Sequence, residues 1–437
     1  MTDRTTAPQF VDDAAAAPPI YKAPPRSTAA PPLTRPHERG RTLLSTIDLP
    51  MLVVVLLLVA IGSLMIYSTT FDWSYQEFGS DTAIFMVHVR NLLIGVGLLT
   101  TLIVVPYRFW KRISVVLLLA TIAGLIAVLI FSDATFGARR AFLQGSYQPG
   151  ELAELVIVVY LAAWLGSKQT KVASIAFGLI PFTILVGGAG VLVLLQPDLS
   201  TAVTILIVAT LMYFLSGANI MHLVSVGGFL GVAGYILSQN FSYAQGRVSS
   251  YIAGLTDLTQ TNYHAQQAII AFLNGGMTGR GLGQGLQKFG NLPTAHTDSI
   301  FAVIGEELGL VGAVFVIFLY VLLAMRGFHI ARRARDPFGA LLAVGVTLLI
   351  VTKAMLNIAV MLNLLPSTGV ALPFISYGGS SLVTMLAGVG LLLSVARTTA
   401  VETSPERGGS RANLDRGWRN RWTRLSGDSH SRSARRS

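Results

Sequence analysis

The residues best suited to chemistry lie in one stretch, 279–312, which reads GRGLGQGLQKFGNLPTAHTDSIFAVIGEELGLVG. A Gly-rich polar segment there leads into an apolar run, and the ionisable side chains along it are Arg280, Lys288, His296, Asp298, Glu306 and Glu307. Each such group is costly in hydrocarbon, so a membrane protein keeps it mainly where it lines a cavity or a reaction site. We therefore predict that this stretch forms the floor of an active site.

Asp298 is the candidate general base, because a carboxylate at the outer membrane boundary could accept a proton from a substrate there. The alternative is structural, since Asp and Thr commonly open helices, and His296, Thr297 and Asp298 could be turn and N-cap residues. One residue can serve both roles. The spacing alone leaves both interpretations open.

Glu306 and Glu307 follow Asp298 by about two helical turns, or roughly 12 Å. The offset turns Glu306 by about 80° from Asp298 around a helix and places Glu307 on the opposite face. Glu306 is therefore predicted to share a cavity with Asp298. The alternative for either glutamate is an interhelical hydrogen bond.

Lys353 lies in the middle of another apolar run, where a lysine must be paired. Glu151 and Glu154 lie three positions apart on one face of a further predicted span, where like charges repel. Charge accounting predicts that Lys353 pairs with Glu151 or Glu154 inside the bundle.

Several cations fall on the side expected to face outward, against the usual preference for the cytoplasm: Arg139, Arg140, Arg247, Arg280 and Lys288. They suit phosphate binding, and contact with lipid headgroups is an equally good explanation. The glycines between 279 and 285 do not form a nucleotide loop, because no strand precedes them and no Gly-Lys-Ser/Thr follows. They are predicted to let the backbone approach a ligand or a neighbouring helix.

Composition indicates an all-α polytopic membrane protein. The 437 residues are 52% hydrophobic and 12% charged, with apolar residues in blocks of about twenty. The absence of cysteine excludes disulfides, thiolate catalysis and Cys-based metal sites. The net charge of +11 does not indicate nucleic acid, because the basic residues flank apolar runs, as membrane orientation requires.

About ten transmembrane helices are expected in a membrane domain covering 49–397, between a polar tail at 1–48 and a basic tail at 398–437. The distribution of Lys and Arg places both termini in the cytoplasm. One long external connection, 239–298, then separates spans seven and eight, with a helix from Tyr263 to Leu273 that ends at Gly275 and turns Ala265, Ile269 and Phe272 to one face. The predicted spans are 49–69, 84–105, 113–132, 150–166, 172–195, 199–216, 219–238, 299–326, 338–363 and 376–396.

Motifs along these spans resemble the SEDS proteins of bacterial cell-wall synthesis, in order and spacing. They are QPGELAEL (148–155), QPDLSTA (196–202), LPTAHTDSIFAVIGEELGLVG (292–312) and LLPSTGVALPFISYGGSSL (364–382). The resemblance covers about 49–397. QKFGNLPTAHTD followed by GEELG looks more like the division branch, FtsW, than the elongation branch, RodA.

The resemblance implies a ten-span peptidoglycan glycosyltransferase that polymerises lipid II on the outer face of the bacterial cytoplasmic membrane. It implies a class B penicillin-binding protein as transpeptidase partner, together with other membrane proteins of division or elongation. The family's essential acidic residue falls on Asp298. Arg247, and with it Arg139, Arg140 and Lys288, could stabilise the departing diphosphate, directly or with a divalent cation (Mg²⁺ or Mn²⁺), and His296 joins Arg280 as a further substrate-binding candidate.

This sequence departs from the family pattern QPSELAK at Gly150 and Glu154, and has Lys353 where an amide is usual. Read together, the changes predict a cation moved from one span to another. Two other functions stay open: a flippase for a lipid-linked precursor, which intramembrane charges also suit, and a non-catalytic scaffold for a partner's transmembrane helix.

Overall fold

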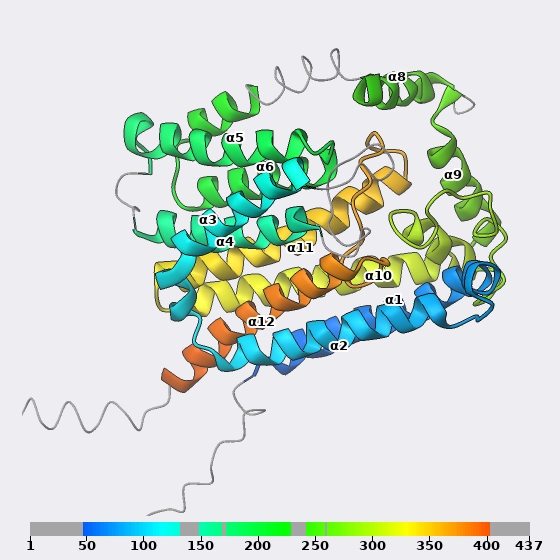
Figure 1. Cartoon of the computed structure of the whole chain (residues 1–437), viewed down its shortest axis with the longest axis horizontal. Helices are drawn as coiled ribbons and strands as arrows, with labels where there is room; N and C mark the ends of the chain where they lie inside the picture. The colour runs from blue at the N-terminus through cyan, green and yellow to red at the C-terminus, as the bar shows by residue number, and fades with distance from the viewer. Residues whose placement is uncertain (1–46, 132–147, 168–171, 229–241, 258–259, 403–437) are drawn as a thin grey trace, which may run out of the picture. The chain divides into compact units, whose positions relative to one another are not determined.

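The computed structural model describes residues 47–131, 148–167, 172–228, 242–257 and 260–402, all within one compact unit, Leu43–Ser437. Nearly all of the two predicted tails lies outside these residues, as do Arg139 and Arg140. The regular structure of the described part is helical throughout (Figure 1), which confirms the predicted fold class. Its helices are α1 (Leu49–Phe78), α2 (Ala83–Val104), α3 (Arg108–Phe131), α4 (Pro149–Ser167), α5 (Ile180–Leu194) after a π-helical turn (Ile175–Leu179), α6 (Leu199–Leu215), α8 (Ser242–Thr256), α9 (Tyr263–Gly275), α10 (Ile300–Arg333), α11 (Pro337–Met361) and α12 (Gly379–Glu402).

Eight of the described helices are long and apolar enough to cross a membrane. They are α1 to α5 and α10 to α12, and α6 is a shorter apolar helix of 17 residues. The predicted span 219–238 is helical over 220–228, and the rest of it lies outside the described residues. The count of ten stays a prediction.

Aspartates open several helices. Asp48 caps α1 by accepting from Met51 N at 3.0 Å, and it also pairs with Arg326 of α10 at 2.7 Å. Asp336 caps α11 and accepts a hydrogen bond from the hydroxyl of Tyr107. Burial, together with the nearby Asp336, raises the pKa of Tyr107 to about 12. These contacts tie the start of α1 to α10, and the start of α11 to the turn between α2 and α3.

Helix α11 lies at the centre of the bundle and contacts α4, α6, α10 and α12 (Figure 1). Along its length Thr347, Lys353 and Asn357 are all buried, so the polar groups of α11 face other helices. Helix α12 packs along α2, and α1 packs against α10. This arrangement places the buried charge of Lys353 of α11 against α4.

Helix α9 confirms the predicted helix in the external connection, and Asn262 caps it through His264 N at 3.1 Å. Its buried face differs from the predicted one and consists of Ala268, Ala271 and Gly275. These small residues allow close packing on α10: a Cβ on Gly275 would lie 1.9 Å from Gly305 O. Phe272 of the predicted face also packs on Phe301 of α10, so close backbone approach and an apolar side chain together form the contact.

Candidate active site

Helix α10 is broken near its N-terminal end. Gly309 has φ 69° and ψ −170°, a conformation outside the helical region, so the carbonyls before it and the N–H groups after it lose their intrahelical partners. Inside a membrane protein such groups must be satisfied by protein. The break therefore needs another segment to complete its hydrogen bonds.

The Gly-rich segment 276–281 completes them. Arg280 N and Gly281 N donate to the carbonyls of Glu306 and Glu307, both at 3.0 Å. On the other side of the break, Leu310 N donates to Gly276 O at 2.9 Å and Val311 N to Met277 O at 3.2 Å. The prediction that these glycines let the backbone approach a neighbouring helix is confirmed, and that helix is α10.

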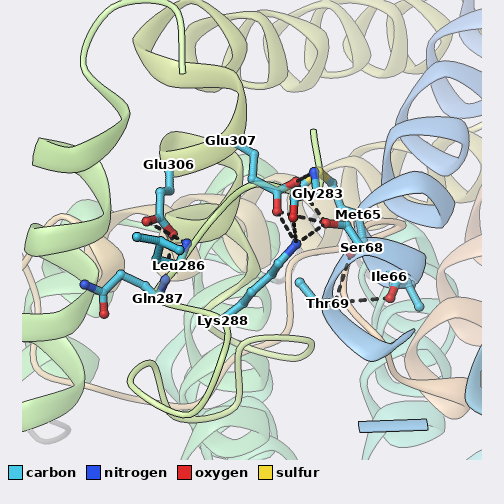
Figure 2. Close-up of polar contacts among 10 residues, drawn as sticks. All are labelled: Met65, Ile66, Ser68, Thr69, Gly283, Leu286, Gln287, Lys288, Glu306 and Glu307. Carbon is cyan, nitrogen blue, oxygen red and sulfur yellow. Dashed lines mark hydrogen bonds and ion pairs between the residues drawn. The ribbon is translucent and has the colours of Figure 1, made fainter. Parts of the chain in front are cut away.

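The side chains of Glu306 and Glu307 hold the rest of this segment (Figure 2). Glu306 accepts from the backbone N–H groups of Leu286 and Gln287, each at 3.1 Å. Glu307 accepts from Gly283 N at 2.9 Å. The prediction that Glu306 shares a cavity with Asp298 is wrong, because its carboxylate is completely buried against the segment.

Lys288 reaches Glu307 in a buried ion pair of 2.6 Å, and both side chains are at most 1% exposed. Its ammonium also donates to Ser68 Oγ of α1 at 2.8 Å and to Gly283 O at 2.9 Å. The rings of Phe71 and Phe289 lie 5.4 and 5.2 Å from the ammonium. All three donors of the Lys288 ammonium are thus engaged. The prediction that Lys288 binds the diphosphate is therefore wrong.

The fit of the segment in the break gives a test with a matched control. Gly279 and Gly283 share a left-handed backbone, with φ 81° and 79°, but a Cβ at Gly279 would lie 2.2 Å from Glu307 O while a Cβ at Gly283 meets nothing within 4 Å. We expect Gly283→Ala to cost about 1–2 kcal/mol of stability from backbone strain alone. Gly279→Ala should cost more than about 4 kcal/mol. Thermal unfolding in detergent measures both, and equal shifts would contradict the packing in the break.

Asp298 lies in a tight turn directly before α10. Its Oδ1 accepts from the hydroxyls of Thr294 and, at 3.1 Å, Thr297. The N-cap position of α10 is Ser299, and no side chain caps the helix there. Asp298 is therefore not the capping residue that the structural alternative required. No described residue donates to its second oxygen, Oδ2, which a Cβ on Gly369 would approach to 3.8 Å.

The backbone of this turn is anchored by the chain that follows α10. Consecutive carbonyls each accept a hydrogen bond from α11 or from the segment before α12, so the position of Asp298 depends on both. The contacts are Tyr377 N to His296 O at 2.8 Å, Ser376 Oγ to Thr297 O at 2.5 Å and Asn357 Nδ2 to Asp298 O at 2.7 Å.

A polar cavity of about 360 Å³ opens beside Asp298. Its wall is built from the starts of α4, α6 and α12, the middle of α11, α8, the turn before α10 and the segment 368–371. The charged side chains that line it are Glu151, Glu154, Asp198, Arg247, Asp298 and Lys353. The cavity thus brings together residues from across the sequence.

Lys353 bridges the two glutamates of α4. Its ammonium lies 2.6 Å from Glu151 Oε2 and 2.8 Å from Glu154 Oε2, and the predicted pairing is confirmed. Glu154 and Lys353 are at most 3% exposed. A cation from α11 therefore neutralises part of the charge that α4 brings to the cavity wall.

The remaining predicted residues are divided between the cavity and other places. Arg247 of α8 borders the cavity and donates to Ser367 O at 2.7 Å. Arg280 is exposed, and its Nε donates to Asn274 O at 3.3 Å outside the cavity. His296 lies against the rings of Trp73 and Tyr377. Burial lowers the pKa of His296, and the charge of Asp298 partly opposes that shift.

Sequence reasoning missed several residues of the cavity wall. Asp198 caps α6 through Thr201 N at 3.1 Å and accepts from Gln148 Nε2 at 2.6 Å, which ties α6 to the start of α4. Thr368 and Ser381 also border the cavity. Their motifs were noted, but polar residues near a turn give no signal of a shared site until the helices are placed.

Comparison with known proteins identifies the family. The FtsW/RodA/SpoVE family model, described as a cell cycle protein, matches residues 48–401. The chain belongs to this family. Residues of each motif that carried the SEDS resemblance line the cavity.

FtsW/RodA/SpoVE relatives match along nearly their whole length. The chain is 36% identical over 353 residues to the probable peptidoglycan glycosyltransferase FtsW of Geobacter sulfurreducens, covering 80% of this chain and 95% of that protein. It is 36% identical over 358 residues to the stage V sporulation protein E of Bacillus subtilis, covering 80% and 97%.

Solved structures of the same family share the fold. The rod shape determining protein RodA of Thermus thermophilus gives a TM-score of 0.60 at 27% identity, covering 80% of this chain and 97% of that one. A chain from the structure described as "Structural coordination of polymerization and crosslinking by a peptidoglycan synthase complex" gives 0.66 at 27% identity, covering 81% and 98%. Membership and helices together make this a multi-pass membrane protein.

A divalent cation is the cofactor that the FtsW/RodA/SpoVE resemblance leaves open. Among the described residues, no group of three or more His, Asp or Glu side chains is placed to hold an ion. One oxygen of Glu151 and one of Glu154 pair with Lys353, and the carboxylate of Asp198 is engaged by Thr201 and Gln148. The described residues do not form a metal site of their own, and no step below depends on one.

Proposed function

We propose that this protein is a peptidoglycan glycosyltransferase that polymerises lipid II in the cavity beside Asp298. The observation that supports the proposal is the meeting of Asp298, Arg247 and the Glu151–Lys353–Glu154 group in one polar cavity of a family member. Relatives of the chain are named peptidoglycan glycosyltransferases. A base, a cation and a polar pocket are the parts that glycosyl transfer from a lipid diphosphate requires.

The proposed reaction starts at Asp298. Thr294 and Thr297 hold Oδ1, which leaves Oδ2 to accept the proton of the acceptor sugar's hydroxyl. As it loses this proton, the hydroxyl oxygen of the acceptor sugar attacks the anomeric carbon of the donor. The bond from that carbon to the diphosphate oxygen breaks, and the configuration of the anomeric carbon is inverted. Arg247 offsets the charge that develops on the departing undecaprenyl diphosphate.

The proposed location is the bacterial cytoplasmic membrane, with the cavity facing outward. The last turns of α1 and the connection after it carry Asp72, Glu77 and Asp81 and no Lys or Arg. Together with the basic residues at the other end of the helices, they support this orientation. We further propose a class B penicillin-binding protein as partner, because the chain resembles a component of a structure described as a peptidoglycan synthase complex. A role in division agrees with the FtsW-like motif, and elongation is its alternative.

The flippase alternative has less support. It was suggested by Glu306, Glu307 and Lys353 as polar groups along a path through the membrane. Glu306 and Glu307 hold the Gly-rich segment in place, and Lys353 is paired with α4. These charged side chains therefore make structural contacts, which would have to break for a lipid headgroup to pass along them.

The test is polymerisation of labelled lipid II by the full chain with its cognate class B penicillin-binding protein, scored as glycan chains on a gel. The partner's transpeptidase is blocked with a β-lactam, so that uncrosslinked chains accumulate. We expect glycan chains when this protein is present and none when the partner is tested alone. Absence of chains, in a reaction where a known homologue works, would overturn the proposal, and transfer of lipid II across liposomes would then identify a flippase.

A further inference from the structure

Three helices begin at the wall of the cavity: α4, α6 and α12. The first turn of a helix has backbone N–H groups without intrahelical partners and a partial positive charge. Such an end attracts either an acidic side chain or an anionic ligand. The way each start is satisfied therefore indicates what the cavity is built to bind.

The starts of α4 and α6 carry acidic residues of the chain. Glu151 lies in the first turn of α4, and Asp198 caps α6 by accepting from Thr201 N at 3.1 Å. The start of α12 differs, because its first turn has no acidic residue. Gly378, whose carbonyl accepts from Leu382 N at 3.0 Å, precedes that turn and has no side chain that could cap it.

Three backbone N–H groups at the start of α12 have no acceptor in the described part of the chain. The backbone nitrogens of Gly378, Gly379 and Ser381 donate no hydrogen bond to any described residue. All three residues border the cavity. The described residues therefore leave three donors at the positive end of a helix.

Ser381 gives an independent indication of a ligand. It is only 8% exposed, it borders the cavity, and its hydroxyl oxygen is buried without a hydrogen-bond partner among the described residues. A buried hydroxyl of this kind costs free energy unless something else binds it. Arg247 borders the same cavity and supplies a positive charge.

We propose that the start of α12 binds the diphosphate of the lipid-linked substrate, with backbone N–H groups of Gly378, Gly379 and Ser381 and the hydroxyl of Ser381 as donors. The inference rests on the proposed function, because that function supplies a lipid diphosphate. An anion fits better than a sugar, since the other cavity-facing helix starts are already neutralised by Glu151 and Asp198 and this one is not. The same group would hold the undecaprenyl diphosphate product.

The test compares Ser381→Asp with Ser381→Asn in the full chain, reconstituted in nanodiscs. The two side chains have nearly the same size, and only Asp brings a negative charge to the first turn of α12. The probes are farnesyl diphosphate, farnesyl phosphate and farnesol, and the measurement is the ligand-dependent rise in unfolding temperature over a concentration series. This binding assay needs no turnover.

We expect the wild type to bind farnesyl diphosphate more tightly than farnesyl phosphate, and farnesol not at all. Ser381→Asp should bind the diphosphate at least about 30-fold more weakly than Ser381→Asn, because a carboxylate there repels the anion. Equal affinities in the two variants would overturn the inference. If Ser381→Asp unfolds at a lower temperature than Ser381→Asn without ligand, Ser381→Ala replaces it. We then expect the affinity for farnesyl diphosphate to fall about 10-fold. An unchanged affinity would count against the site.

The outcome is separable from that of the proposed function. Charge-dependent diphosphate binding without any polymerisation would leave the site in place and remove the glycosyltransferase. Polymerisation together with equal diphosphate binding by the Asp and Asn variants would support the glycosyltransferase and remove the diphosphate site. Substrate and product are compared by repeating the titration on an Asp298→Asn background with lipid II and with undecaprenyl diphosphate.

Discussion

Asp298→Asn is expected to lower polymerisation of lipid II by about 10²–10⁴-fold, the usual contribution of a general base. Asn keeps an oxygen that can accept from Thr294 and Thr297, so the turn should retain its shape. What it lacks is a carboxylate oxygen that can take the proton of the acceptor hydroxyl. The measurement is the initial rate of chain formation with the cognate partner present.

Asp72→Asn is the matched control. Asp72 lies near the C-terminal end of α1, accepts from Gln76 at 2.8 Å and does not border the cavity. It should leave the polymerisation rate and the unfolding temperature unchanged. If Asp298→Asn retained the wild-type rate while folding normally, Asp298 would not be the base.

Lys288→Met should be among the most destabilising single changes in the protein. It leaves the carboxylate of Glu307 buried without its cation, and breaking a buried pair in this way costs about 3–5 kcal/mol. It also removes the donors that reach Ser68 and Gly283, so the Gly-rich segment loses its link to α1. The expected result is a large fall in unfolding temperature in detergent.

The double variant Lys288→Met with Glu307→Gln provides the control, because it removes the uncompensated charge. It should unfold at a higher temperature than Lys288→Met alone. Arg280→Met, in the same segment but exposed, should shift the unfolding temperature little. A double variant no more stable than Lys288→Met would show that the charge of Glu307 is not the source of the loss.

The sequence predicts much of the fold, because the apolar runs of a membrane protein report directly on its helices. The start of α9 at Tyr263 and the pairing of Lys353 with Glu151 and Glu154 also follow from local rules. Each needs only helical periodicity or the high cost of an unpaired charge in a membrane. Neither requires knowledge of how distant segments cross.

The break in α10 could not be predicted in this way. Glu306 and Glu307 were placed by helical angles counted from Asp298, but Asp298 lies in a turn before α10, and the Gly-rich segment occupies the space beside the two glutamates. The assignment of Lys288 to the diphosphate could not be corrected from the sequence, because its partner Ser68 lies 220 positions away and is near it only in the folded protein. Gly309, two positions after Glu307 in an apolar run, is the one local signal of such a break.

The break in α10 also bears on the order in which the protein can assemble during synthesis. Its partners, from Ser68 to Val311, are all made before the ribosome reaches α11, and segments made first can fold first. The anchors of the Asp298 turn, in contrast, come from Asn357, Ser376 and Tyr377. A nascent chain that has just completed α10 can thus close the scaffold around the break, while the carboxylate of Asp298 waits for α11 and the segment before α12 to arrive.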